Sequence, residues 1–418
     1  MNVMSSDSAR VLRFKRMVPL ALVASAALFF LLLAFPAARQ SSIFPYDELC
    51  DYRMFIRPTM QSERPYEPKA VVYPRDACYP PIAYCAVGAL ASDRGEKWSL
   101  AAGERRLVVS IFLLQLLGAL VLTRRLPGWR ARAAAALAIL ASPACICSVL
   151  RGNPSGWAFA LVCVFLCWYE SESWAKRMVA ALALGAATAL KVAPCLFGLL
   201  YLEEVFRAPR RLRWTEILVA AAAAVVLVFV PFAFYGGFGA VPHWIANARA
   251  NADFYSRDNP LWGLVAFANH VIDSPEPALP CAGAFAMATR LAAAALALAS
   301  LAPVGRYRRL LFIGAAMACM THHDYGGAYL APAFIAWLAD APVARKGAGV
   351  ALLLEAVAWF AVFTPLQLPN PFHDGSMNSM LQNEFLFVLL ACALVPVPRE
   401  PPRILGFGAY TPRTADLV

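Results

Sequence analysis

The sequence predicts an all-α integral membrane protein: a polytopic helical bundle of about ten spans and one re-entrant hairpin. The chain of 418 residues is 61% hydrophobic and 15% charged, with a mean hydropathy of +0.58. Soluble domains average about 45–50% apolar and about 25% charged residues. Long charge-free runs reach the roughly 20 residues that a helix needs to cross a bilayer. Because backbone in lipid must satisfy its own hydrogen bonds, we expect these runs to be helices.

The expected spans follow the apolar runs in order. They cover residues 17–37, 100–123, 131–150, 155–170, 215–235, 280–302, 309–320, 328–340, 347–367 and 383–397. The first run is longer than the roughly 7–15 residues of a signal-peptide core, so we expect a retained helix rather than a cleaved leader. The chain then divides into a basic tail (1–16), a membrane domain (17–397) whose first outer loop is 38–99, and a second tail (398–418).

Basic residues set the expected orientation. The formal charge of +11 is spread over short clusters between apolar runs, which favours membrane topology over a nucleic-acid partner. Alternate loops carry the clusters TRRLPGWRAR, AKR, RAPRRLR, GRYRR and ARK. Lys and Arg accumulate in cytoplasmic loops. We therefore expect a multi-pass protein of the cell (plasma) membrane with both termini in the cytoplasm.

Residues 178–203 break the alternation, because basic clusters stand on both sides of them. Lys191 lies in the middle, close to Pro194. Each apolar half spans about 18 Å at about 1.5 Å per residue, too short for a hydrocarbon core of about 30 Å. The segment is therefore predicted to be a re-entrant hairpin with Lys191 near its tip, where a cation suits a phosphate group.

Other polar residues stand within or between apolar runs. An ionisable group in a membrane costs about 2.5–3.5 kcal/mol, so Arg290 and Glu355 either serve function or pair and snorkel. His322 and His323 lie in the stretch THHDYGG between two short spans. Adjacent side chains point apart, which suits hydrogen bonds to a phosphate better than metal binding, for which i, i+4 spacing is typical. We expect no metal and no cofactor.

The first outer loop offers two carboxylates and two thiols. The stretch YDELCDYRMFIRP places Asp47 and Asp51 four residues apart, on one face if the segment is helical. They are catalytic or simply solvated. Cys50 and Cys78 lie in the same loop, which we expect on the outer face of the membrane, where oxidising conditions let disulfides persist. They either form a disulfide with each other or are unrelated thiols.

Four stretches, in order, resemble glycosyltransferase family 87. The first is an aspartate loop with DYRMF, RPYEP and CYPPIAY, and the second is the polar turn RGNPSG before a helix. The third, GAATALKVAPCLFGLLYL, runs into Lys-x-x-Pro, and the fourth is THHDYGGAYLAPAF. The likeness extends over about residues 45–340. Asn153 stands where the family often has a glutamine, and the proline usual before the histidine stretch is absent.

The resemblance implies a GT-C-like fold and a hexosyltransferase, mannosyl-transferring, that uses a polyprenyl-phosphate-sugar donor. Its acceptor would be a glycolipid or glycan on the outer membrane face, and its other partners membrane lipids, with no nucleic acid. Asp51 best matches the general base on the acceptor hydroxyl, with Asp47 in reserve. The hydroxyl would attack the anomeric carbon with inversion as the lipid phosphate leaves.

The resemblance also implies how the leaving phosphate is stabilised. His322 or His323 matches the residue that steadies the donor phosphate, and Lys191 and Arg53 would add positive charge. Cationic donors fixed in advance stabilise charge that develops in a transition state.

Two other functions remain open from the sequence. A transporter or flippase of a lipid-linked sugar would use the same intramembrane cations but would need no base in the first outer loop. A structural or assembly subunit would use the four stretches for packing alone.

Overall fold

The computed structural model describes residues 6–33, 52, 56, 66–67, 78–91, 100–202, 213–254, 282–321, 324–339, 348–366 and 381–394. These residues form helices and turns, without a strand among them. The α-helices are α1 (Ser6–Leu33), α4 (Pro81–Ala91), α5 (Leu100–Thr123), α6 (Trp129–Leu140), α7 (Pro143–Leu150), α8 (Ser155–Trp168), α9 (Trp174–Leu190), α11 (Trp214–Phe229), α12 (Val241–Phe254), α14 (Ala282–Ser300), α15 (Arg306–Thr321), α16 (Ala331–Ala339), α17 (Ala348–Phe363) and α18 (Leu381–Leu394). The 3-10 helices are η2 (Ala193–Gly198), η4 (Val230–Ala233), η5 (Phe238–Ala240) and η7 (Asp324–Leu330). The helical class that the sequence predicts is confirmed for this part of the chain.

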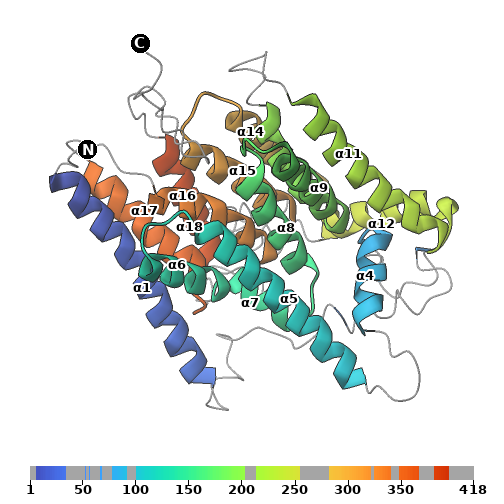
Figure 1. Ribbon diagram of the computed structural model, residues 1–418, viewed down its shortest axis with the longest axis horizontal. Helices are drawn as coiled ribbons and strands as arrows, with labels where there is room; N and C mark the ends of the chain where they lie inside the picture. The colour runs from blue at the N-terminus through green and yellow to red at the C-terminus, as the bar shows by residue number, and fades with distance from the viewer. Residues whose placement is uncertain are drawn as a thin grey trace, which may run out of the picture.

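Helix α8 is the centre of the bundle. Its sequence SGWAFALVCVFLCW is apolar on nearly every side, and nearly all of its side chains are buried, as in a helix enclosed by others. Helices α5 and α9 pack against it. Helix α1 packs against α6 and α17 on one side of the molecule, while α11 packs against α9 on the other (Figure 1).

Three of the described helices are long and apolar enough to cross a membrane by themselves: Arg13–Leu32, Gly103–Thr123 and Trp214–Ala233. The pair α6 and α7 forms a fourth candidate with a 55° bend. Pro143 has no N–H to continue α6, and Ser142 Oγ accepts the N–H of Cys145 to begin α7. Several other expected spans, including 155–170 and 347–367, form helices of 10–17 residues.

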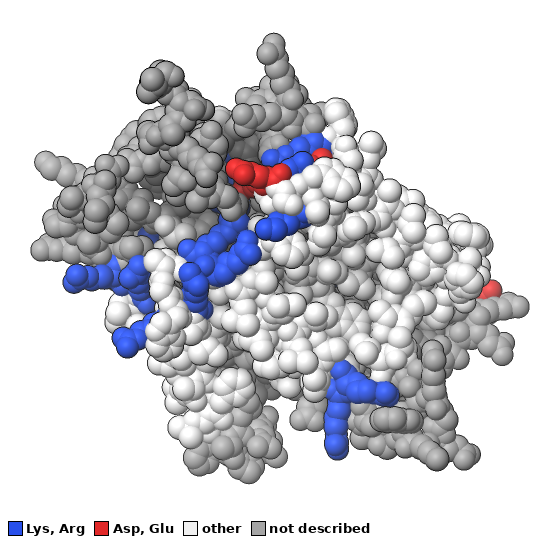
Figure 2. Space-filling model, in the orientation of Figure 1, with Lys and Arg blue, Asp and Glu red and all other residues white. Residues whose placement is uncertain are grey.

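Charged side chains gather at two levels. Figure 2 shows a band of basic side chains across the upper left of this face and a smaller basic group near the bottom, with largely uncharged surface between them. Large apolar side chains on α1, α5 and α11 are exposed, among them Leu31, Leu113 and Leu218. An apolar surface of this extent needs an apolar solvent, which a lipid bilayer supplies.

The chain reverses direction at Lys191, which is extended (φ −153°, ψ 123°) at the end of α9. Helix η2 then runs back along α9, since a Cβ on Gly198 would lie 3.9 Å from Leu184 Cδ2. Farther on, the rings of Tyr201 and Tyr169 lie 6.4 Å apart, and Tyr169 stands just before α9 begins. Both ends of the segment therefore lie at one end of the bundle; that the segment re-enters a membrane stays a prediction.

Helices α4 and α12 were not expected from the sequence: α4 lies within residues 38–99, which we expect to be the first outer loop, and α12 lies between the expected spans 215–235 and 280–302. Helix α4 packs against α5, α9 and α11. In α12, Trp244 Nε1 donates to the carbonyl of Cys78 (3.1 Å), and Asn247 Nδ2 donates to the carbonyl of Tyr66 (3.2 Å). Helix α12 thus holds the chain at residues 66 and 78 in place.

The close approach of α9 and α11 depends on Gly185. A Cβ there would lie 2.5 Å from the carbonyl oxygen of Ala220 and 2.6 Å from the Cβ of Ala223, and small residues are what let membrane helices approach closely. We expect Gly185→Val to lower the Tm of the detergent-purified protein by a few degrees, since overpacking costs about 1–3 kcal/mol. Gly349→Ala is the control, because nothing lies within 4 Å of its Cβ position. Equal Tm values for Gly185→Val and the wild type would contradict this packing.

Candidate functional site

One site residue that the sequence singles out, Lys191, falls within the described part of the chain. Five others fall outside it: Asp47, Asp51, Arg53, His322 and His323. Cys50 also lies outside the described residues, so its disulfide with Cys78 stays a prediction. The site is therefore built from Lys191 and from the described neighbours of the other residues.

The polar turn RGNPSG joins α7 to α8 and depends on one glycine. Gly152 has a φ of 68°, a left-handed conformation in which a side chain is strained. The turn brings the N–H of Asn153 to the carbonyl of Ser148 (2.9 Å). Asn153 is fully buried, and its Oδ1 accepts hydrogen bonds from the backbone N–H (2.9 Å) and the hydroxyl (2.6 Å) of Ser155. The asparagine side chain thereby fixes the first residue of α8.

A chain of side-chain hydrogen bonds runs from this turn in two directions. Lys191 Nζ donates to Ser155 Oγ (2.8 Å), and Ser155 Oγ donates to Asn153 Oδ1 (2.6 Å). Asn153 Nδ2 in turn donates to the hydroxyl of Tyr79 (2.7 Å). We call these four residues the polar chain. It ties together three of the four stretches described above: the CYPPIAY stretch, the polar turn and the Lys-x-x-Pro stretch.

The polar chain holds Lys191 in a defined place near the start of α8. Ser155 offers a neutral hydroxyl oxygen, and its hydrogen bond fixes the position of the ammonium group (2.8 Å). The side chain is partly buried at the C-terminal end of α9, where the helix dipole favours a cation. An ammonium group held at a helix end inside an apolar bundle is well placed to bind an anionic oxygen.

Aromatic residues fix the position of Tyr79 through hydrogen bonds to its backbone. The Tyr66 hydroxyl donates to the carbonyl of Tyr79 (3.0 Å), and the N–H of Tyr79 donates to the Tyr84 hydroxyl (3.3 Å). Burial, with a smaller contribution from Tyr235, raises the pKa of Tyr66 above its ordinary value, so its hydroxyl remains a donor. The Tyr84 and Tyr235 rings stack with their centroids 5.7 Å apart.

The start of α8 is held tightly against α5 and α7. Gln115 Nε2 donates to Ser148 Oγ (2.9 Å), and both side chains are buried. A Cβ on Gly156 would lie 2.6 Å from Ile111 Cγ2 and 2.8 Å from Gln115 Nε2. Because this glycine leaves no room for a side chain, the beginning of α8 and the adjoining polar chain have little freedom to shift.

The histidine stretch joins the same region through η7, which begins at Asp324, directly after His323. Helix η7 packs against α7 and against α8. Its Tyr329 ring lies 6.5 Å from the ring of Phe197 in η2. A Cβ on Gly314 of α15 would lie 2.8 Å from the Tyr329 carbonyl oxygen, so this glycine lets α15 approach η7 closely.

The chain next to Asp51 is anchored at the polar turn as well. The N–H of Tyr52 donates to the carbonyl of Arg151 (3.1 Å), and the Tyr52 side chain is buried. Arg151 is the first residue of the RGNPSG turn. Described parts of three of the stretches therefore meet around the start of α8, and η7 of the fourth packs against α7 and α8.

Glu355 and Arg290 have different surroundings. Glu355 accepts from Trp337 Nε1 (2.8 Å) and from the Tyr307 hydroxyl (3.4 Å), while Lys15 Nζ donates to the Trp337 carbonyl (2.7 Å). These bonds join α1, α15, α16 and α17, which favours the structural interpretation of Glu355. Arg290 is exposed on α14.

Tyr79, Ser155 and the role of Asn153 were not predicted from the sequence. The available signal was a polar turn between two strongly apolar helices, where buried polar side chains need partners. Among the residues that the structure describes, no three His, Cys, Asp or Glu side chains gather as metal ligands.

Comparison with sequence models of known families identifies the family of this chain. A sequence model of glycosyltransferase family 87 matches residues 78–323, more than half of the 418 residues. The matched range contains the whole polar chain and both candidate histidines, and it begins after Asp47 and Asp51. The chain belongs to glycosyltransferase family 87, and the protein is a multi-pass membrane glycosyltransferase. A search of curated proteins found no match, and neither did a search of solved structures.

Proposed function

We propose that this glycosyltransferase moves a hexosyl group, specifically mannosyl, from a polyprenyl-phosphate donor to a glycolipid or glycan acceptor. The reaction takes place on the outer face of the plasma membrane, within a GT-C-like bundle whose two termini are cytoplasmic. The observation that carries the proposal is the polar chain, which fixes an ammonium group at the point where three of the four family-like stretches meet.

In this proposal Lys191 binds the donor phosphate. As the bond between the sugar and the phosphate breaks, negative charge grows on the phosphate oxygens. A donor group that is already in position stabilises this charge without having to reorganise. Ser155, Asn153 and Tyr79 act as positioning residues for Lys191. His322, His323 and Arg53 add further hydrogen-bond donors to the same phosphate.

The acceptor is activated by Asp51, with Asp47 as the reserve. The acceptor oxygen attacks the anomeric carbon and forms the new glycosidic bond, while its proton passes to the Asp51 carboxylate. The bond from the anomeric carbon to the phosphate oxygen breaks, and polyprenyl phosphate leaves with the electron pair. A single displacement of this kind inverts the anomeric configuration. The anchoring of Tyr52 at the polar turn supports this role for the residue before it.

The positioning role of Ser155 gives a specific expectation. Ser155→Ala removes the acceptor for Lys191 Nζ, and a hydrogen bond to a charged group is worth about 1.5–3 kcal/mol. We expect the donor KM to rise about tenfold or more, with a smaller change in kcat, in steady-state transfer assays. Ser155→Thr, which keeps the hydroxyl, should recover part of the loss. Ser171→Ala, at the far end of α8, is the control. Unchanged kinetics for Ser155→Ala, with the protein folded, would remove Ser155 from the site.

The proposed activity is tested by incubating the purified protein with labelled polyprenyl-phosphate mannose and a membrane extract. We expect label to appear in a glycolipid or glycan, and parallel incubations with other polyprenyl-phosphate hexoses to give less product. Transfer from another hexose alone would correct the sugar and keep the reaction class. No transfer from any lipid-phosphate sugar, by protein that is folded, would contradict the proposal.

A further inference from the structure

Gln115 is a buried amide near the middle of an apolar helix. It belongs to α5, lies within the candidate span Gly103–Thr123 and is 1% exposed. Two other polar residues of this helix, Ser110 and Thr123, donate to carbonyls of α5 itself (2.7 and 2.8 Å). Gln115 instead donates from Nε2 to the Oγ of Ser148 in α7 (2.9 Å). Burying an amide is costly unless it is hydrogen-bonded, and Gln115 meets this requirement outside its own helix.

Ser148 connects Gln115 with the polar turn RGNPSG. A serine hydroxyl has a single hydrogen. Because the hydroxyl oxygen accepts from Gln115, its hydrogen is directed to the carbonyl oxygen of Asn153, 3.5 Å away. The backbone carbonyl of Ser148 also accepts from the N–H of Asn153 (2.9 Å). Ser148 therefore holds the backbone of Asn153 by two hydrogen bonds, and Gln115 orients the hydroxyl that forms one of them.

Gly156 leaves the space that this contact needs. A Cβ at this position would lie 2.8 Å from Gln115 Nε2 and 2.9 Å from Ser148 Oγ. A side chain there would therefore push away the two atoms that form the hydrogen bond. Gly156 is the second residue of α8 and directly follows Ser155. The start of α8 thus has room for the Gln115 amide next to the residue that holds Lys191.

Four hydrogen bonds connect Gln115 with the ammonium group of Lys191. The first two lead through Ser148 to the backbone of Asn153. Asn153 Oδ1 then accepts from the Ser155 hydroxyl (2.6 Å), and Ser155 Oγ accepts from Lys191 Nζ (2.8 Å). The three residues between the two ends are buried. Because buried networks of satisfied hydrogen bonds rigidify the groups that they join, a change at Gln115 should be felt at Lys191.

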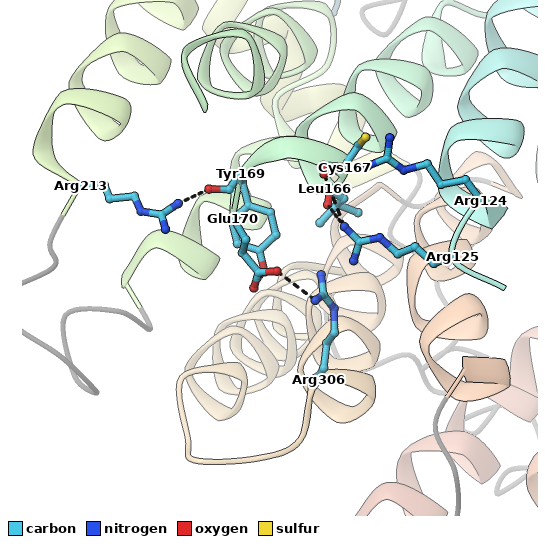
Figure 3. Close-up of polar contacts among 8 residues, drawn as sticks. All are labelled: Arg124, Arg125, Leu166, Cys167, Tyr169, Glu170, Arg213 and Arg306. Atoms are coloured by element: carbon cyan, nitrogen blue, oxygen red, sulfur yellow. Dashed lines mark hydrogen bonds and ion pairs between the residues drawn. The ribbon is translucent and has the colours of Figure 1, made fainter. Parts of the chain in front are cut away.

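The opposite end of α8 is fastened without Gln115. Arg124 and Arg125, the two residues that follow α5, donate to the carbonyl of Cys167 near the end of α8 (3.3 and 3.4 Å; Figure 3). Between the two levels α5 and α8 approach closely at Gly118, where a Cβ would lie 3.0 Å from a Cα of α8. The packing of α5 on α8 therefore has other supports, and loss of the Gln115 amide should loosen the polar turn without separating the helices.

We propose that Gln115 is a positioning residue for the donor-phosphate site and that it acts on Lys191 through Ser148 and the polar turn. This role rests on the proposed function, in which Lys191 binds the phosphate of the polyprenyl-phosphate donor. Gln115 fixes the turn, so that Ser155 Oγ stays where it accepts from Lys191 Nζ. A binding group that is held in advance loses less freedom when its ligand arrives. Without the amide, the ammonium group should occupy its binding position less often.

The test measures equilibrium binding of polyprenyl phosphate, without a sugar, to the full-length protein in detergent. Gln115→Met keeps the length of the side chain and removes the amide. We expect binding to weaken by about three- to tenfold, a factor that a neutral hydrogen bond contributes, while the Tm stays close to that of the wild type. Thr123→Val is the matched control, because it removes a buried polar group of α5 that bonds to its own helix, and it should leave binding unchanged.

A double-mutant cycle separates an effect through Lys191 from an effect on packing. The cycle compares the wild type, Gln115→Met, Lys191→Met and Gln115→Met/Lys191→Met. Once Lys191 is replaced, loss of the Gln115 amide should change the affinity by less than about twofold, since the group that Gln115 positions is already absent. Ser148→Ala interrupts the same path one step later and should give the same pattern. It replaces Gln115→Met in the cycle if that variant does not fold.

Two results would overturn this role of Gln115. One is wild-type affinity for polyprenyl phosphate in both Gln115→Met and Ser148→Ala. The other is equal weakening by Gln115→Met in the presence and in the absence of Lys191, which would make Gln115 a packing residue alone. The proposed function has its own readout in the same cycle. Wild-type affinity in Lys191→Met would remove the phosphate role of Lys191 and the role of Gln115 with it, whereas weak binding by Lys191→Met together with normal binding by Gln115→Met would overturn the role of Gln115 alone.

Discussion

Replacement of Asp51 by asparagine should lower the rate of sugar transfer by about 10²–10⁴-fold, the usual contribution of a general base. Asparagine has nearly the same size as aspartate but cannot take the proton of the acceptor hydroxyl. Binding of the donor should be retained, because the phosphate contacts in the proposal come from other residues. The measurements are kcat for transfer and equilibrium binding of labelled polyprenyl-phosphate mannose.

Asp47→Asn is the matched control for this variant. It removes the same charge four residues earlier in the chain and should reduce the rate much less. A rate above a tenth of the wild-type value in Asp51→Asn, together with a large loss in Asp47→Asn, would move the base to Asp47. Near-normal rates in both variants would rule out the proposed mechanism.

The second large effect is expected at Lys191. Lys191→Met keeps a long flexible side chain but removes the ammonium group, and hydrogen bonds to charged groups contribute about 1.5–3 kcal/mol. At about 1.4 kcal/mol for each factor of ten, the affinity for polyprenyl phosphate should fall by about 10–100-fold. Binding of polyprenyl phosphate without a sugar is the measurement, since it reports the phosphate contact alone.

Lys176→Met makes the same substitution near the opposite end of α9 and should leave this binding unchanged. The Tm of Lys191→Met should not fall, because the substitution takes a charge out of an apolar bundle. Wild-type affinity for polyprenyl phosphate in Lys191→Met would show that this lysine does not hold the phosphate.

Much of the fold could be predicted from the distribution of apolar residues and charges. The expected span 100–123 coincides with α5 (Leu100–Thr123), because the run is long and continuous. The reversal at Lys191 could be predicted because basic clusters flank both sides of a segment with a central charge and proline. Helix α1 instead begins at Ser6, before the expected 17, since its basic residues extend the helix beyond the apolar run.

The rest depends on contacts between distant parts of the chain. Lys191 and Ser155 are 36 residues apart, and Asn153 and Tyr79 are 74 apart, so no local pattern reports either bond. Helix α12 has a mixed composition and lies in a long connection. Its hydrogen bonds from Trp244 and Asn247 reach residues that are distant in the sequence, so the sequence alone does not predict them. The four family-like stretches indicate which segments of the chain contribute to the site. The fold shows how their described parts contact one another.

The central claim is that the protein transfers the sugar and releases the lipid phosphate. Its most direct test uses a polyprenyl-phosphate mannose labelled in both the sugar and the phosphate, added to the purified protein in vesicles with a glycolipid acceptor. We expect the sugar label to move to the acceptor with inverted configuration, while the phosphate label stays on the polyprenyl chain. Intact doubly labelled donor that has only changed leaflets would contradict it and identify a flippase.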